Sequence, residues 1–307
     1  MDATSLGWWG VPLAIAGGAV RVGAPLLWVS LGETVTEKAG RINLGLEGTL
    51  LMGAMTAYAV ALASGSPWLG VVGAAGVGLM LGALHGLLCS LKRVNDTAMG
   101  VAMMLAGSGL AYWLGKPLIQ PSAPSLPAIP LGAFTTQPAV QAALDINPLF
   151  VIGVVLAFAV HWALGHTRFG LRLRVVGDSE NAARALGLSP TAYRVAATAF
   201  GGACAAVGGT SLSLVYPGAW SEALSSGQGI MAVALVIFAR WDPRRCILAG
   251  LLFGGASAIS PALQALGYTE GYYLFSALPY VLTLALMVAL GKPGPRNGAP
   301  GELSLNR

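Results

Sequence analysis

The sequence has little charge. Only 9% of its 307 residues are Asp, Glu, Lys or Arg, whereas soluble domains carry about 25%. So few charged side chains could not cover a water-facing surface, which excludes a soluble globular protein. Cysteine is also scarce, and Cys89, Cys204 and Cys246 lie far apart in apolar or juxtamembrane segments. This spacing is not that of a metal or redox site.

Sequence patterns of catalysis are missing as well. There is no Gly-x-x-x-x-Gly-Lys-(Ser/Thr) motif to bind ATP phosphates, and no Ser–His–acid or Cys–His arrangement stands out. The histidines His85, His161 and His166 are not grouped like a metal site. We therefore expect a chain that is not an enzyme by itself and that binds no cofactor or metal.

Hydrophobic residues are abundant: they make up 55% of the chain, with 43 glycines and a mean hydropathy of +0.71. A helix needs about 20 mostly apolar residues to cross the hydrocarbon core, and glycine lets helices approach closely in a membrane. The sequence predicts an all-α, polytopic transmembrane helical bundle of about 8–10 spans, with residues 1–307 forming one domain. The apolar runs are Val11–Leu31, Leu44–Ala63, Trp68–Leu91, Thr97–Leu114, Pro148–Leu164, Ala192–Val215, Gly229–Ala239, Cys246–Leu266 and Tyr272–Leu290.

Basic residues fall at the ends of these runs and indicate the topology. If residues 165–194 lie in the cytoplasm and each run crosses once, every Lys and Arg except Lys116 and Arg21 lies inside or at the inner surface. This asymmetry satisfies the positive-inside rule, so the net charge of +5 reflects orientation rather than nucleic-acid binding. We expect a multi-pass protein of the bacterial inner membrane. Its C-terminus is cytoplasmic, with a disordered tail over about 292–307.

The longest basic inner segment, 167–190, predicts a short cytoplasmic helix. Asp178 or Ser179 can cap its start, whereas Gly187 and Pro190 end it. Its small residues are Ala182, Ala183 and Ala185. Such a helix could fit a groove on another protein, or it could be a plain interfacial helix beside its arginines.

A polar motif spans residues 32–48 and contains Glu33, Glu37, Asn43 and Glu47. Asn43 and Glu47 are one helical turn apart and would share one face of the second helix. Because a carboxylate near hydrocarbon costs a few kcal/mol, it normally faces a cavity or a partner. Glu33 and Glu37 are open to a second interpretation, as solvated residues of a cytoplasmic loop.

Other polar residues begin later spans. Asn95 and Asp96 either cap the fourth span or line an inner vestibule. Ser226 and Gln228 either hydrogen-bond a solute or form a solvated helix start. With Asn43 and Glu47, these are the candidate residues of the substrate pathway.

The polar motif resembles the Gly-Glu…Glu-(Lys/Arg)-x-Gly-x-x-Asn-(Ile/Leu)-Gly-x-Glu-Gly signature of ATP-binding-cassette permeases that work with basic-membrane-protein-type nucleoside receptors. Related sugar permeases typically show Gly-Gly-Ile-Asp-Leu-Ser at this point. The resemblance continues at Val94-Asn95-Asp96, where the family often has Glu in place of Asp96. It also includes Phe169–Arg172 and the Glu-Ala-Ala…Gly pattern of the coupling helix, matched by Glu180, Ala182, Ala183 and Gly187.

The resemblance implies a permease subunit of an ATP-driven importer in the branched-chain amino acid, ribose and nucleoside superfamily, with nucleosides as substrate. It assigns Arg172, Glu180, Ala182, Ala183 and Gly187 to coupling with a cytoplasmic ATPase, which would bind ATP and Mg²⁺. It also implies a second permease subunit, which the short chain length favours as a homologous heterodimer partner, and a receptor that is a lipoprotein or periplasmic protein.

Three other functions remain open from the sequence. The first is a permease for ribose or another simple sugar. The second is a secondary transporter driven by protons or sodium, with Glu47 and Asp96 as carriers. The third, a membrane-embedded enzyme acting on lipid, lacks a catalytic constellation.

Overall fold

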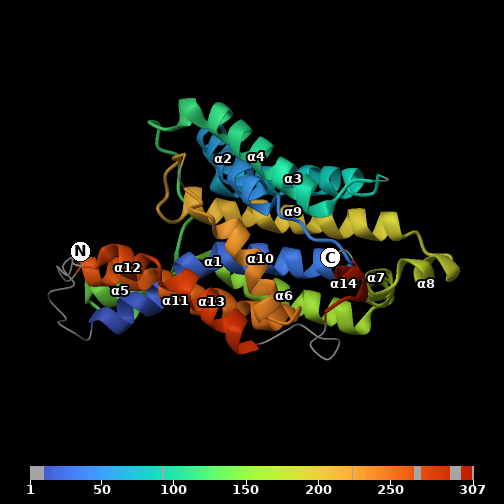
Figure 1. Ribbon diagram of the computed structural model, residues 1–307. Coiled ribbons are helices and arrows are strands. Elements are labelled where there is room, and N and C mark those ends of the chain that lie inside the picture. The colour runs from blue at the N-terminus through green and yellow to red at the C-terminus, as the bar shows by residue number, and fades with distance from the viewer. Residues whose placement is uncertain (1–9, 92, 223, 266–270, 291–298, 306–307) are drawn as a thin grey trace.

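The computed structural model describes residues 10–91, 93–222, 224–265, 271–290 and 299–305. Almost all regular structure in these ranges is helical (Figure 1). The long elements are α1 (Gly10–Lys38), α2 (Leu46–Ser64), α3 (Pro67–Leu88), α4 (Asp96–Gly115), α6 (Pro148–His166), α9 (Pro190–Leu214) and α11 (Pro243–Ala265). The shorter helices are α5 (Pro138–Leu144), α7 (Arg168–Asp178), α8 (Glu180–Ala185), α10 (Gln228–Phe238), α12 (Tyr272–Ser276), α13 (Leu278–Leu290) and α14 (Gly301–Leu305).

Within the described ranges, strands occur only in the loop that joins α4 to α6. Between α4 and α6 lie two 3-10 turns, η3 (Lys116–Leu118) and η4 (Leu131–Phe134), and two short strands, β1 (Ile129–Pro130) and β2 (Asp145–Ile146). The strands pair antiparallel, with Ile129 opposite Ile146. Proline and small residues dominate this loop, which accounts for its lack of a spanning helix.

Seven of the described helices are long and apolar enough to cross a membrane: α1, α2, α3, α4, α6, α9 and α11. The prediction of an all-α, polytopic bundle is thereby confirmed. The seventh apolar run becomes α10, whose 11 residues extend only about 16 Å at 1.5 Å per residue. It cannot cross a bilayer about 30 Å thick by itself.

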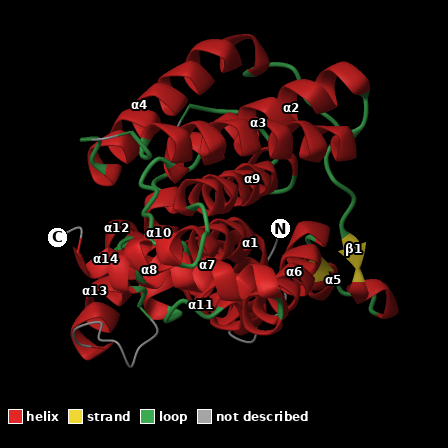
Figure 2. Ribbon diagram, turned by 90° about the vertical axis from the view of Figure 1, so that its right-hand side faces the viewer, coloured by secondary structure: helices red, strands yellow, loops and turns green. Residues whose placement is uncertain are grey.

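The long helices are arranged around a central pair, α1 and α9 (Figures 1 and 2). On one side lie α2, α3 and α4, and on the other lie α6 and α11. The outward faces of α3, α4 and α6 expose large apolar side chains such as Leu105, Trp113 and Val155. These faces suit a lipid environment, whereas α2 and α9 are largely enclosed by their neighbours.

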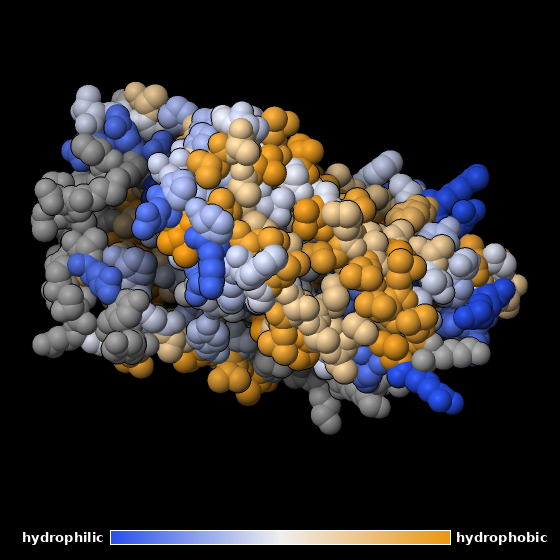
Figure 3. Space-filling view, turned by 90° about the horizontal axis from the view of Figure 1, so that it is seen from above, coloured by the Kyte–Doolittle hydropathy of each residue, from blue (hydrophilic) through white to orange (hydrophobic). Residues whose placement is uncertain are grey.

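Both ends of the bundle carry most of the polar side chains. In Figure 3, apolar residues form a band across the middle, and hydrophilic ones gather at the end that holds α7 and α8. The short α14 lies at this end, beside α7 (Figure 1). The prediction of a disordered tail is therefore wrong for residues 299–305, because Glu302 in α14 accepts a hydrogen bond from the Glu180 backbone N–H at 2.7 Å. Residues 292–298, 306 and 307 lie outside the described residues.

Glycines allow α3 and α9 to approach closely. A Cβ on Gly82 would collide with the backbone carbonyl of Thr198, and one on Gly78 with that of Gly202. Without these side chains, the two backbones come into direct contact, as is common where helices associate in membranes. The bundle on the α2–α4 side depends on this contact.

We predict that Gly82→Ala destabilises the folded protein by about 1–3 kcal/mol, as overpacking of a tight core does. The matched control is Gly76→Ala in the same helix, where an added Cβ would meet nothing within 4 Å. Thermal unfolding of both variants in detergent should show a lower midpoint for Gly82→Ala alone. Equal midpoints would contradict this account of the α3–α9 contact.

Candidate functional site

The polar motif after the first span is largely helical and buried. Helix α1 continues to Lys38, and the side chains of Glu33 and Glu37 are 0% and 3% exposed. Their interpretation as solvated loop residues is therefore wrong. The helix extends past the apolar run because the protein supplies partners for both carboxylates.

Those partners come from two connections. The Asn43 backbone N–H donates to Glu33 Oε1 at 2.8 Å, and the Trp241 indole N–H, after α10, donates to Glu37 Oε2 at 2.5 Å. Asn43 precedes α2, which begins at Leu46, so it does not share a helix face with Glu47. Its Oδ1 accepts from the Gly45 N–H at 2.9 Å. This side chain instead shapes the turn between the first two helices.

Glu47 is buried against the start of α10. Its Oε1 accepts hydrogen bonds from the Ser225 hydroxyl and from the Gly227 N–H at 3.1 Å. Its Oε2 accepts from the N–H groups of Gly229 at 2.6 Å and Ile230 at 3.3 Å. The carboxylate thus occupies the N-terminus of a helix, where both the free N–H groups and the helix dipole favour a negative charge.

Ser226 and Gln228 belong to the same region, as the chain enters α10. Ser226 has a φ of +47°, and its carbonyl accepts from the Tyr280 hydroxyl at 3.3 Å. The Gln228 Oε1 is buried and has no hydrogen-bond partner within the described protein. A buried unpaired amide oxygen is unusual, so this position can accept a hydrogen bond from another molecule.

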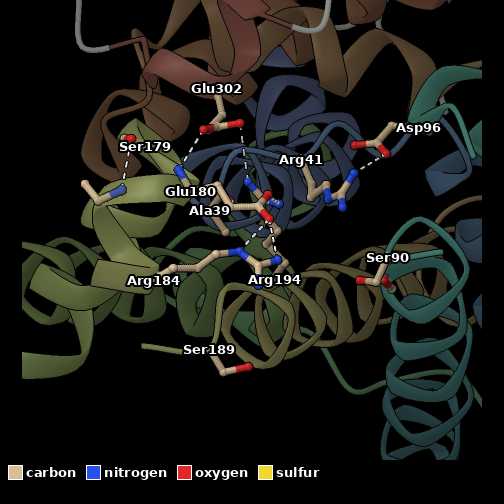
Figure 4. Close-up of polar contacts among 12 residues, drawn as sticks. Ala39, Arg41, Ser90, Asp96, Ser179, Glu180, Arg184, Ser189, Arg194 and Glu302 are labelled. Carbon is tan, nitrogen blue, oxygen red and sulfur yellow. Dashed lines mark hydrogen bonds and ion pairs between the residues drawn. The ribbon is translucent and has the colours of Figure 1, made fainter. Parts of the chain in front are cut away.

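Asn95 and Asp96 lie at the start of α4. The Asn95 Oδ1 accepts from the Ala98 N–H at 3.0 Å, which confirms the predicted cap. Asp96 forms an ion pair with Arg41 at 2.5 Å (Figure 4). The cap and the vestibule are not exclusive, because both residues also line a cavity.

This inner cavity has a volume of about 600 Å³, within the usual range of small-molecule sites. Its wall is formed by the connection from α1 to α2, the start of α4, the end of α10 and residues 299–303. Of the predicted pathway residues, Asn95 and Asp96 line it, whereas Glu47, Ser226 and Gln228 form a separate group at the other end of α10. Arg41 and Trp241 also line the cavity and were not among the predicted site residues.

The segment 167–190 contains two helices, α7, which was not predicted, and the predicted short capped helix, α8. The Ser179 hydroxyl accepts from the Ala182 N–H at 3.3 Å, and Gly187 follows α8 with a φ of +73°. Pro190 is the first residue of α9. Of the small residues on α8, Ala182 and Ala185 are exposed and Ala183 is buried.

Glu180 fixes α8 to the rest of the bundle. Its carboxylate contacts Arg184 at 2.6 Å and Arg194 at 2.5 Å, and the Arg194 Nε–H donates to the Ala39 carbonyl at 3.3 Å (Figure 4). The hydrogen bonds from Arg184 and Arg194 hold the pKa of Glu180 below its usual 4.5. Its negative charge is therefore present at neutral pH.

The predicted coupling residues differ in their surroundings. Arg194, which contacts Glu180, is 5% exposed and was not among them, although its place just after the coupling pattern is a usable signal. Arg172, in contrast, is exposed and donates to the Tyr193 hydroxyl at 3.5 Å.

No cluster of three or more His, Cys, Asp or Glu side chains that could bind a metal occurs within the described ranges.

Seven apolar helices and a capped polar hairpin at one end define a multi-pass membrane protein. The chain belongs to the family of branched-chain amino acid transport system permease components, whose model matches residues 8–291. It is therefore a permease component of a transport system.

Relatives within this family transport different solutes, according to their names. The putative glucose ABC transporter permease protein TsgC13 of Haloferax volcanii is 32% identical over 80% of this chain and 77% of its own length. The nucleoside ABC transporter permease protein NupC of Lactococcus lactis is 29% identical over 87% of this chain and 89% of its own. The guanosine ABC transporter permease protein NupQ of Bacillus subtilis is 28% identical over 90% and 92%.

We predict that Glu47→Gln destabilises the protein, because the amide would direct N–H groups at backbone N–H donors. The free energy of unfolding should fall by at least the contribution of one charge-assisted hydrogen bond, about 1.5–3 kcal/mol. Thermal unfolding in detergent measures it, with Glu222→Gln on an exposed loop as the control. An unchanged midpoint for Glu47→Gln would show that the carboxylate does not stabilise the start of α10.

Proposed function

We propose that this chain is the membrane-spanning subunit of an ATP-driven importer that carries nucleosides into the bacterial cytoplasm. It works with a second permease subunit, a homologue of this chain, and with cytoplasmic ATPases that dock on α8. A lipid-anchored or periplasmic receptor delivers the solute to the outer face. The C-terminus lies on the cytoplasmic side with α7 and α8, as the distribution of basic residues favours.

One observation carries the ATP-driven mechanism. Helix α8 presents exposed Ala182 and Ala185, yet its first residue is joined to the buried Arg194 at the start of α9. A protein that moved α8 would therefore also move α9, which packs against α1, α2 and α3 in the centre of the bundle. ATP can drive such a movement only by favouring one conformation of the ATPases over the other.

The choice of nucleosides rests on two supports. The first is the sequence motif with Asn43, Gly45, Glu47 and Gly48. The second is the similarity to NupC and NupQ over nearly their whole length. A sugar is the second candidate, because the similarity to TsgC13 reaches 32% identity. In both cases, the solute is neutral and hydrogen-bonding.

The geometry argues against ion-coupled transport through Glu47 and Asp96. Both Glu47 oxygens accept hydrogen bonds from the start of α10, and Asp96 is paired with Arg41. A carrier carboxylate must gain and lose a cation in each cycle. Here, loss of the charge would break the contacts that position α10 and α4.

We predict that Glu180→Lys abolishes substrate-stimulated ATP hydrolysis by the assembled transporter, because a lysine would face Arg184 and Arg194. Gly187→Pro should do the same, since proline cannot adopt the positive φ of that position. ATPase activity in proteoliposomes measures the effect, and Glu222→Lys on the exposed loop is the control. Both variants should reach the membrane in normal amounts. Normal stimulation in both would remove α8 from the coupling role.

For the substrate, we predict that excess guanosine or adenosine inhibits uptake of a labelled nucleoside in a strain that depends on this transporter, and that ribose does not. A protein that carries nucleosides must discriminate the base as well as the sugar ring. Competition by ribose or glucose, but not by guanosine or adenosine, would instead establish the sugar alternative.

A further inference from the structure

The last described segment, residues 299–305, forms part of the wall of the inner cavity. Ala299, Pro300 and Leu303 line it together with Asn95, Asp96 and Trp241. Pro300 is buried, so the segment is packed into the protein at this point. The cavity is thus bounded on one side by the C-terminal segment rather than by a spanning helix.

The same segment contacts residues 167–194, which include α7, α8 and the start of α9 and are called the coupling hairpin below, through Glu302. Its Oε1 accepts from the Glu180 N–H at 2.7 Å, and its Oε2 lies 3.5 Å from the Arg194 guanidinium (Figure 4). Its backbone also fits closely, since a Cβ on Gly301 would lie 2.5 Å from the Asp178 carbonyl oxygen. Glu302 therefore connects the wall of the cavity to two groups beside α8, the Glu180 N–H and the Arg194 guanidinium.

We propose that residues 299–305 are a cytoplasmic gate over the inner cavity, and that Glu302 links this gate to the coupling hairpin. Movement of α8 changes the position of the Glu180 N–H and of Arg194, which are the two groups that Glu302 contacts. The segment then moves away from Asn95 and Asp96 and opens the cavity to the cytoplasm. This inference rests on the proposed function, since an ATPase must act on α8.

The charges of the cavity define the solute that would wait behind the gate. Asp96 is neutralised by Arg41 at 2.5 Å, and Glu37 is bonded to the Trp241 N–H. Arg93 also lines the cavity and is exposed to solvent, and most of the other lining residues are apolar, among them Ile42, Val233 and Ile237. A neutral small molecule with hydrogen-bonding groups fits this wall better than an ion, which would compete with the existing pairs.

The contacts of the gate are few enough to be released. The ion pair between Glu302 and Arg194 is long, at 3.5 Å, whereas Arg194 contacts Glu180 at 2.5 Å. Arg194 keeps its Glu180 partner when Glu302 moves away. The link can therefore break without leaving the buried guanidinium unpaired.

The test measures entry into the cavity directly. A cysteine is introduced at Val233, in the cavity wall, in a variant whose three native cysteines are alanine. Inside-out membrane vesicles are treated with a bulky, charged maleimide, and the labelling rate is compared with Glu302 intact and with Glu302→Ala. We expect Glu302→Ala to increase the rate on the order of tenfold, since a 1.4 kcal/mol shift of the gate equilibrium has that effect.

Three controls make the result specific. Glu222→Ala, on the exposed loop, should leave labelling at Val233→Cys unchanged. A cysteine at Ala185, exposed on α8, should label at the same rate with and without Glu302. A chain that ends at residue 298 should label as fast as Glu302→Ala or faster, which provides a second variant that removes the whole gate.

Equal labelling of Val233→Cys with Glu302 intact, with Glu302→Ala and in the shortened chain would overturn the gate. This outcome is separate from failure of the proposed function, because labelling needs neither ATP nor a nucleoside. If the labelling changes as expected but nucleosides do not compete for uptake, the gate stands and the substrate assignment fails.

Discussion

Hydrocarbon offers no hydrogen bonds, so a polar group buried in this bundle is costly unless the protein supplies a partner. The Glu47 carboxylate and the start of α10 meet that constraint together. Helix α10 is too short to span the membrane, and its free N–H groups at Gly229 and Ile230 donate to a charge supplied by α2. A short helix and a carboxylate in a neighbouring helix therefore form one structural feature. The unpaired Oε1 of Gln228 lies at the start of the same helix and can accept a hydrogen bond from another molecule.

The end of the bundle that holds α7 and α8 is also joined by a small number of polar contacts. Arg194 bonds the carbonyl of Ala39 at the end of α1, the carboxylate of Glu180 on α8, and the carboxylate of Glu302 on α14. Three parts of the chain that are distant in sequence thus meet at one buried guanidinium, whose planar fork suits several acceptors at once. A displacement of α8 changes the partners of this group, and with them the wall of the inner cavity. In this account, the coupling hairpin and the solute path are linked by hydrogen bonds rather than by a long rearrangement of helices.

The sequence predicted the helical class, most of the apolar helices and a cap at Asp178 or Ser179, because hydropathy and capping are local properties. It did not predict that the first helix continues past Leu31 to Lys38. It identified the residues of the polar motif but not their roles. Glu33 and Glu37 read as loop residues since their partners, Asn43 and Trp241, are contributed by other segments, one of them 204 positions away. Asn43 was placed on a helix because its spacing from Glu47 fits one turn. Helix α14 escaped prediction for a similar reason: five residues carry no periodicity, and their order depends on contacts with Glu180 and Arg194.

The central claim, that α8 faces the cytoplasm where an ATPase can reach it, is tested most directly by sidedness. A cysteine at Leu186, whose side chain is 69% exposed at the end of α8, is offered a membrane-impermeant maleimide in intact cells and in inside-out vesicles. The account predicts labelling in the vesicles alone. Labelling in intact cells would place the hairpin on the outer face and would contradict the orientation, the coupling role and the gate together.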